Sequence, residues 1–179
     1  MDFSEIYERY VRDVHRFALY LSGNQALAED LTSETFVHAW CGRSDLRVGT
    51  VKAYLFAIAR NLYRDFLAHQ RRLVPSDELP EPTDPAPGPD LTTQDRQEFA
   101  NVLRAIQRLP EMQRETLALA VDQELSYEQI AVILGCSVAA VKVRIHRARL
   151  KLKLELEKLE KLGKLEKLQN QKKEQAWKT

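Results

Sequence analysis

A segment near the C-terminal end, SYEQIAVILGCSVAAVKVRIHRARLKLK (residues 126–153), constrains the fold more than any other part of the chain. Ser126 and Gln129 have the spacing of a capping box, which begins a helix by satisfying its first backbone N–H groups. Gly135 can adopt the left-handed conformation that ends a helix and turns the chain, and Ser137 can cap the next helix. The pattern therefore predicts two helices joined by a tight turn, which is a helix-turn-helix.

The second helix of this pair combines an apolar stripe with unbroken positive charge. Residues at steps of three and four form the stripe: Val138, Val141, Ile145, Ala148 and Leu152. Residues 136–153 carry six Lys or Arg and no acid, and the basic side chains lie off the stripe. A helix of this kind fits the major groove of DNA. The alternative is a solvated surface helix, but the cap, the turn and the charge coincide here, so we favour DNA binding.

Proline divides the chain into two helical blocks. Six of the seven prolines fall between Pro75 and Pro89, in an acidic stretch that does not favour regular structure. Apolar residues at helical spacing predict an all-α fold, with helices at 3–21, 25–41, 51–72, 92–107, 110–122, 126–135 and 137–153. We therefore expect a small domain of three to four helices at 1–72, a Pro-rich linker at 73–91, a four-helix domain at 92–153 and a helical tail at 154–179.

The net charge of +1 hides a strong segregation of charge. Bases exceed acids by four in residues 51–72 and by six in 136–153, whereas acids exceed bases by six in 73–98. A nucleic acid would meet these local fields rather than the total. The two cysteines fit neither a metal site nor a disulfide framework, and the sequence has no signal-like or membrane-spanning segment. We expect a soluble cytoplasmic protein with no enzymatic activity, cofactor or metal.

The first block offers two helices of opposite character. The helix at 51–72 interleaves bases with aromatic side chains, as surfaces for single-stranded nucleic acid do. Alternatively, its bases form a solvated face and its aromatic residues belong to the core. For each aromatic residue by itself we favour the core; these residues are Tyr54, Phe56, Tyr63 and Phe66. The helix at 25–41 places acids beside Phe36 and Trp40. Those acids either complement the helix dipole or surround an aromatic docking face for a protein.

In this order the pieces resemble the bacterial sigma factors of the extracytoplasmic-function class, over about residues 3–152. AEDLTSETF resembles the helix that binds the polymerase clamp, and VKAYLFAIARNLYRDFLAHQRR resembles the promoter-melting helix. LPEMQRETLALAVDQELSYEQIAVILGCSVAAVKVRIHRARLKL resembles the domain that binds the minus-thirty-five element and the polymerase flap. The resemblance implies a sigma-2-like and a sigma-4-like domain that direct core RNA polymerase to promoters and assist melting, with an anti-sigma factor as a further partner.

The resemblance also implies three sets of site residues. Contacts to core polymerase would come from Asp30, Ser33, Glu34, Phe36 and Trp40. Contacts to the single-stranded minus-ten element would come from Arg43, Lys52, Tyr54, Arg60, Asn61, Arg64 and Asp65. Contacts to the minus-thirty-five duplex would come from Ser137, Ala139, Ala140, Lys142, Val143, Arg144, His146, Arg147 and Arg149. The chain departs from the family at Ala140 and Val143, where members often have Thr and Ser, and at Ser33, where many have Gln.

The tail after Leu150 does not match the family. Its leucines repeat every three residues from Leu156 to Leu168, a spacing that drifts around a helix, and Gly163 weakens it further. We expect a solvated helical extension rather than a docking helix. For the whole chain, the main alternative is a helix-turn-helix regulator whose N-terminal domain senses a ligand in a pocket. A helical adaptor that binds no DNA is the third.

Overall fold

The computed structural model describes residues 2–42, 50–73, 93–122 and 124–176, with side chains as far as Lys164. These residues form seven α-helices and, over the ranges described, no strand. The all-α prediction is therefore confirmed. Arg43, most of the loop that follows Cys41, and the predicted linker from residue 74 onward lie outside the described residues.

The N-terminal block consists of α1 (Phe3–Ser22), α2 (Gln25–Cys41) and α3 (Val51–Leu73). Asp2 and Glu5 form a capping box at the start of α1, and the Asn24 side chain caps α2. Gly23 ends α1 in the left-handed conformation, with φ 65°. A Cβ at this position would lie 2.6 Å from the Gln107 side chain, so the glycine also lets α4 approach closely.

The C-terminal block consists of α4 (Thr93–Gln107), α5 (Glu111–Ala120), α6 (Tyr127–Leu134) and α7 (Val138–Ala176). Pro110 occupies the position before α5, where a missing backbone N–H costs nothing. The second helix of the predicted helix-turn-helix and the tail are one continuous helix, which runs through Gly163. No single helix among the described residues is long and apolar enough to span a membrane; α6 and α7 pass that test only as a pair bent by 95°.

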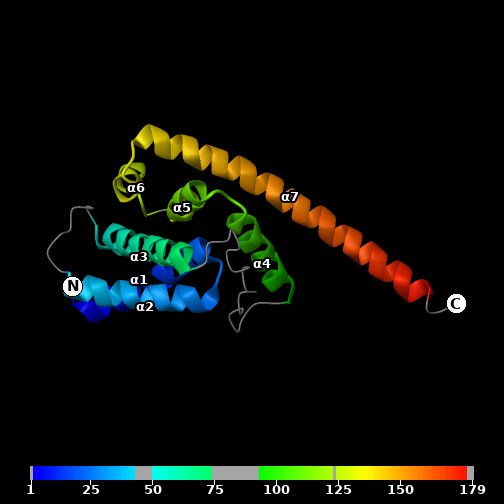
Figure 1. Ribbon diagram of the computed structural model, residues 1–179, viewed down its shortest axis with the longest axis horizontal. Helices are drawn as coiled ribbons and strands as arrows, with labels where there is room; N and C mark the ends of the chain where they lie inside the picture. Colours follow the sequence, from blue (N-terminus) through cyan, green and yellow to red (C-terminus); the bar gives the residue numbers. More distant parts are fainter. Residues whose placement is uncertain (1, 43–49, 74–92, 123, 177–179) are drawn as a thin grey trace.

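The two blocks pack against each other around a shared core, and a second, smaller apolar cluster lies within the C-terminal block. Figure 1 shows α1 and α2 in one layer, α3 next to them, α5 and α6 on the other side of α3, and α7 along the outside. Phe17 of α1 stacks on Phe56 of α3 with ring centroids 4.7 Å apart. A single cluster of buried apolar residues continues from these rings to Leu119 and Ile130 of the C-terminal block. The shared core fixes how the surfaces of the two blocks face each other.

The first turns of the tail also pack on the C-terminal block. Glu155 is only 8% exposed and accepts hydrogen bonds from Lys158 Nζ (2.8 Å) and from Arg108 Nη1 (3.3 Å). The bond from Lys158 lowers the pKa of the Glu155 carboxyl; burial opposes this shift and Arg108 adds to it. The expectation of a solvated tail is therefore wrong for its first turns, because Arg108 lies just after α4 and anchors them.

Candidate nucleic-acid and protein interfaces

The helix-turn-helix is built by the contacts that its sequence predicts. Ser126 Oγ accepts from the backbone N–H of Gln129 (3.2 Å), and Gln129 Oε1 accepts from the backbone N–H of Ser126 (2.9 Å). Gly135 has φ 62°, and Ser137 Oγ accepts from the backbone N–H of Ala140 (3.2 Å). These caps fix where α6 ends and α7 begins, and so they set the direction in which α7 presents its outer face.

The outer face of α7 carries most of the residues predicted to contact duplex DNA. Val141, Ile145 and Ala148 of the predicted stripe are at most 3% exposed. On the other side the exposed residues are Ser137, Ala139, Lys142, Val143, His146, Arg147 and Arg149. Ala140 and Arg144 are half-buried, and an Arg144 Nη1 lies 3.5 Å from Cys136 Sγ. The helix therefore presents an exposed cationic face, and a major groove is wide enough to admit an α-helix.

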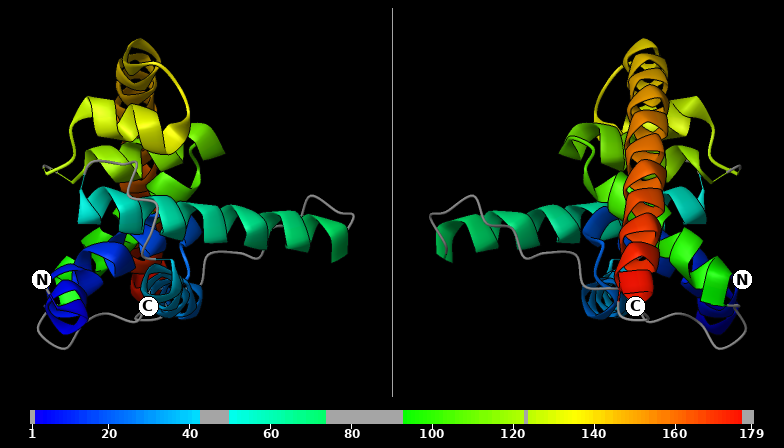
Figure 2. Two further views of the ribbon diagram at one scale, coloured as in Figure 1. Left: turned by 90° about the vertical axis from the view of Figure 1, so that its left-hand side faces the viewer. Right: turned by 90° about the vertical axis from the view of Figure 1, so that its right-hand side faces the viewer.

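The residues predicted to hold single-stranded DNA divide into two groups on α3. Asn61, Arg64 and Asp65 are exposed, and Figure 2 shows part of α3 projecting beyond its neighbours. Tyr54 is half-buried and donates from Oη to the carbonyl of Gly42 (2.9 Å), which ties the start of α3 to the end of α2. Lys52 and Arg60 are buried. Among the aromatic residues, burial of Phe56 and Tyr63 confirms that they belong to the core, whereas Tyr54 and Phe66 are half-buried.

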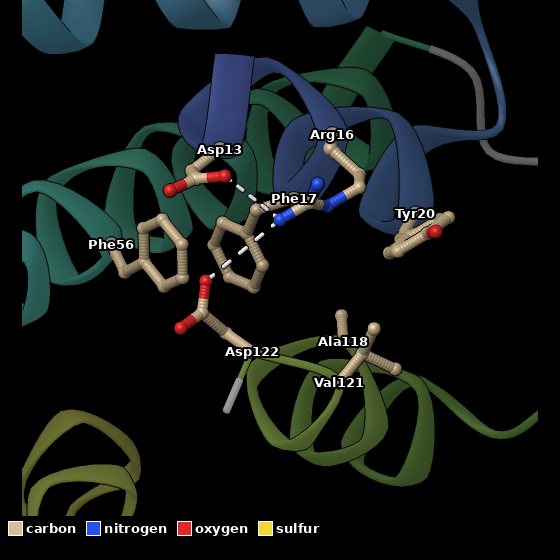
Figure 3. A pocket seen from close by; sticks show the side chains of 8 residues that line it. All are labelled: Asp13, Arg16, Phe17, Tyr20, Phe56, Ala118, Val121 and Asp122. Carbon is tan, nitrogen blue, oxygen red and sulfur yellow. Dashed lines mark hydrogen bonds and ion pairs between the residues drawn. The ribbon is translucent and has the colours of Figure 1, made fainter. Parts of the chain in front are cut away.

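Lys52 lies in a cluster of carboxylates. Its Nζ is 2.7 Å from Asp13 of α1, 2.7 Å from Asp122 and 3.1 Å from Glu124. Burial alone would lower the pKa of Lys52, but hydrogen bonds to Asp122, Asp13 and Glu124 outweigh burial and raise this pKa above its ordinary value. Asp13, Arg16 and Asp122 also line a small cleft at the seam between α1, α3 and α5 (Figure 3). The cation of Lys52 is thus already neutralised within the chain.

Arg60 is held in the same way, farther along α3. Its Nε pairs with Glu115 Oε2 at 2.9 Å, and its Nη1 donates to the carbonyl of Ile133 at 3.0 Å. Both charged side chains of the pair are buried. Arg71 makes an exposed pair with Glu111, also at 2.9 Å.

Arg114 is a buried cation that sequence reasoning missed. Its Nη2 donates to Tyr63 Oη (3.1 Å) and its Nη1 to Gln107 Oε1 (3.0 Å). Burial raises the pKa of the Tyr63 phenol, so the phenol remains neutral in this contact. Nothing in the spacing of Arg114 or Glu115 marks them as partners of α3. The only signal was local charge, since acids exceed bases by two in residues 99–135 and bases exceed acids by four in residues 51–72.

The face of α2 predicted to bind a protein is an exposed aromatic patch with acids beside it. Trp40 packs edge-on against Phe3 (centroids 4.8 Å apart), and Phe36 packs against Tyr7 (4.8 Å). Trp40 is 52% exposed, whereas Phe36 is 4% exposed and supports the patch from beneath. Asp30, Ser33 and Glu34 are exposed. Sequence reasoning missed the contributions of Tyr7 and Val37, both of which are exposed.

Comparison with known proteins identifies both blocks. The model of "Sigma-70 region 2" matches residues 6–73, and that of "Sigma-70, region 4" matches residues 99–152. The chain is 37% identical over 147 residues to the ECF RNA polymerase sigma factor EcfG of Rhodopseudomonas palustris. The aligned residues cover 79% of this chain and 78% of EcfG. It is 35% identical over 158 residues to the ECF RNA polymerase sigma factor SigE of Mycolicibacterium smegmatis, covering 86% of this chain but only 61% of SigE.

A solved structure agrees with these matches. The sigma factor RpoE of Bartonella quintana, determined in complex with the anti-sigma factor NepR, superposes with a TM-score of 0.76 at 29% identity. The superposition covers 87% of this chain and 97% of that one.

Proposed function

We propose, since this chain belongs to the extracytoplasmic-function family of RNA polymerase sigma factors, that it directs core RNA polymerase to specific promoters through two DNA-facing helices and one protein-facing helix. The observation that carries the proposal is the exposed cationic face of α7, presented by a fully capped helix-turn-helix. In this role Lys142, Arg144 and Arg147 bind bases and phosphates of the minus-thirty-five duplex in the major groove. Arg149 adds a phosphate contact.

The melted minus-ten element is assigned to α3 and to the loop before it. Asn61 is exposed and its amide can pair with a base edge, while Arg64 beside it supplies a cation for phosphate. Pulling a base out of the stack costs a few kcal/mol, so a site that accepts only certain bases converts melting into sequence selection. Lys52, Tyr54, Arg60 and Asp65 belong to the same proposed surface, and so does Arg43.

The aromatic patch on α2 is assigned to core polymerase. Trp40 is a large exposed anchor, and Asp30 and Glu34 give its surroundings a negative charge, a combination typical of interface hot spots. The C-terminal domain would meet the polymerase flap. An anti-sigma factor is a further inferred partner, because the similar RpoE was solved with one. The protein acts as an initiation factor, in the cytoplasm, and leaves RNA synthesis to the polymerase.

The alternative of an N-terminal sensing domain is less favoured. Residues 6–73, where such a domain would lie, match sigma-70 region 2 instead. Run-off transcription with purified core polymerase on a promoter library separates the two functions: we expect selective initiation only when this protein is added. Unchanged start-site selection would contradict the proposal.

Two variants test the division of labour. Arg147→Ala should weaken promoter binding and leave association with core polymerase intact, because Arg147 is exposed on α7 whereas the aromatic patch belongs to α1 and α2. Glu34→Arg should reduce polymerase association and leave DNA binding intact. Lys161→Ala, which removes an exposed cation from the tail of the same helix as Arg147, is the matched control and should change neither. If both test variants altered the same property, the assignment of separate surfaces would be wrong.

A further inference from the structure

The outer face of α7 carries apolar side chains along its middle. Each residue of an α-helix is rotated by about 100° from the one before it, so residues at steps of three and four share a line. Ala139, Val143 and Leu150 share such a line and are exposed, Val143 to 48% and Leu150 to 54%. The buried Val141 and Ile145 lie on the opposite side of the helix. This apolar line is therefore the part of α7 that points farthest from the protein.

The cations of α7 lie at the two margins of the apolar line. By the same rotation, Lys142 and Arg149 lie on one side of the line and Arg147 on the other, and all three are exposed. Arg144 lies farther round, half-buried, with its Nη1 3.5 Å from Cys136 Sγ. A helix in the major groove has base edges in front of it and a phosphate backbone on each side. The margins thus suit the phosphates, and the apolar line suits the base edges.

Val143 and Ala139 belong to the part of α7 that comes closest to bases in a bound duplex. The N-terminal turns of a recognition helix contact the base edges. Ala139 and Val143 lie in the first two turns of α7, whereas Leu150 lies about 10 Å farther along the helix axis than Val143. Because Val143 is branched at Cβ, it has one strongly preferred χ1 rotamer in a helix, and its two methyl groups are held in place.

Methyl groups at this position discriminate between bases. Of the four bases, thymine alone presents a methyl group in the major groove, at its C5 atom. Packing Val143 against this group removes apolar surface of both partners from water, which is favourable. Opposite guanine, adenine or cytosine, the same side chain would cover hydrogen-bonding groups without pairing with them, which is costly. The side chain of Val143 therefore favours thymine over the other three bases.

We propose that Val143, with Ala139 beside it on the same line, is a specificity-determining residue that packs against the C5-methyl group of a thymine in the minus-thirty-five duplex. The cations at the margins keep the DNA contacts already assigned to them. This inference rests on the proposed function of α7 and deepens it, because it names a base that the helix reads and the chemical group by which the base is read.

Deoxyuridine tests the contact, because it differs from thymidine only by the missing C5-methyl group and keeps every hydrogen-bonding group. The probe is the strongest promoter recovered from the run-off library, prepared as a fluorescent duplex. Each thymine within about ten base pairs around the minus-thirty-five position is replaced singly by deoxyuridine. Affinity is measured by fluorescence anisotropy with the full-length chain bound to core polymerase. We expect at least one replacement to weaken binding about 4-fold, the factor for the burial of about one methyl group.

Two valine variants assign this loss to a residue. Val143→Ala removes two methyl groups and retains a good helix former, so the loss caused by deoxyuridine should fall below about 2-fold. Val132→Ala is the matched control, because it makes the same change at a valine that is 58% exposed on α6 instead of α7. This control should keep the loss of about 4-fold. The difference between the variants measures the coupling between the protein and DNA methyl groups, as in a double-mutant cycle.

The outcomes separate the thymine contact from promoter recognition itself. If no deoxyuridine weakened binding by more than about 1.5-fold, or if Val143→Ala kept the full loss, the contact would be refuted while the sigma-factor function stood. If Val143→Ala weakened association with core polymerase and left the deoxyuridine loss unchanged, the apolar line would be a protein-binding surface, and the proposal would again be refuted. If the library yielded no promoter at all, the proposed function would fail, and the thymine contact with it.

Discussion

The helices α3 and α7 are both basic, but their cations are used differently. On α7 the side chains of Lys142, Arg147 and Arg149 are exposed. On α3 the side chains of Lys52 and Arg60 are buried in ion pairs with the other domain. The difference arises because Asp122 and Glu115 lie beside α3, whereas Arg147 and Arg149 of α7 form no ion pair within the described part of the chain. Local charge therefore indicates what a helix can bind, and packing decides what it binds in this conformation.

The comparison has a functional consequence. A duplex can reach α7 while the two domains are together, but a single strand can reach only the exposed side chains of α3, among them Asn61 and Arg64. Removing a cation from α3 is thus expected to change the stability of the protein and its coupling to the facing carboxylate. Removing a cation from α7 is expected to change how DNA binding depends on salt.

The largest difference is expected in stability. Arg60→Ala leaves Glu115 buried without its cation, and we expect a loss of at least about 3 kcal/mol in the free energy of unfolding. Arg147→Ala removes an exposed cation with no buried partner, so its effect should stay below about 0.5 kcal/mol. Urea denaturation followed by circular dichroism measures both. Equal losses in the two variants would contradict the different environments of α3 and α7.

Much of the fold could be predicted because its signals are local. The helices follow from apolar spacing. The capping box of Ser126 and Gln129 and the left-handed Gly135 predict the residues at which the first helix of the helix-turn-helix begins and ends. These interactions join residues at most a few positions apart, so the sequence alone contains both partners. The continuous α7 shows the limit of such signals, since Gly163 lies within a helix.

The candidate site could be predicted only in part, because its long-range contacts leave no pattern. Arg60 and Glu115 are 55 positions apart, and the chain holds many other acids that could pair with Arg60. The same holds for Arg108 and Glu155, whose contact docks the first turns of the tail. Composition suggested that α3 binds an acidic partner, but it could not show that an acidic surface of the same chain occupies Lys52 and Arg60.

A charge swap tests whether the α3 pair acts as a pair. Arg60→Glu and Glu115→Arg should each destabilise the protein, because each places two like charges together. The double variant should recover about 2 kcal/mol relative to the sum of the single losses, the range measured for close charge pairs in double-mutant cycles. It should also bind single-stranded DNA poorly, since α3 has lost a cation. Additive losses would mean that the two side chains do not interact across the interface.

The matching test on α7 concerns salt rather than stability. Arg147→Ala should weaken binding to duplex promoter DNA about 10-fold and reduce the log–log salt slope by about 1, since one phosphate or base contact is lost. Titration by fluorescence anisotropy at several NaCl concentrations measures both quantities. Lys161→Ala should leave the slope unchanged. An unaltered slope for Arg147→Ala would remove Arg147 from the DNA interface.

The smallest expected effect is that of alkaline pH on the α3 contact. The pKa of Lys52 is raised in the folded protein, so its contribution is complete below the ordinary lysine pKa of about 10.4 and is lost only as pH rises through the higher folded value. Asp13, Asp122 and Glu124 face its ammonium group, and Arg16 contacts Asp13 and Asp122 at the same place. We therefore expect the loss in free energy of unfolding caused by Lys52→Gln to stay constant from about pH 7 to about pH 10. Urea denaturation of the parent and the variant at each pH measures this loss, and Lys161→Gln should cause none. A loss that began to shrink near pH 8 would show that Lys52 is not held by the three carboxylates, and α3 would then resemble α7.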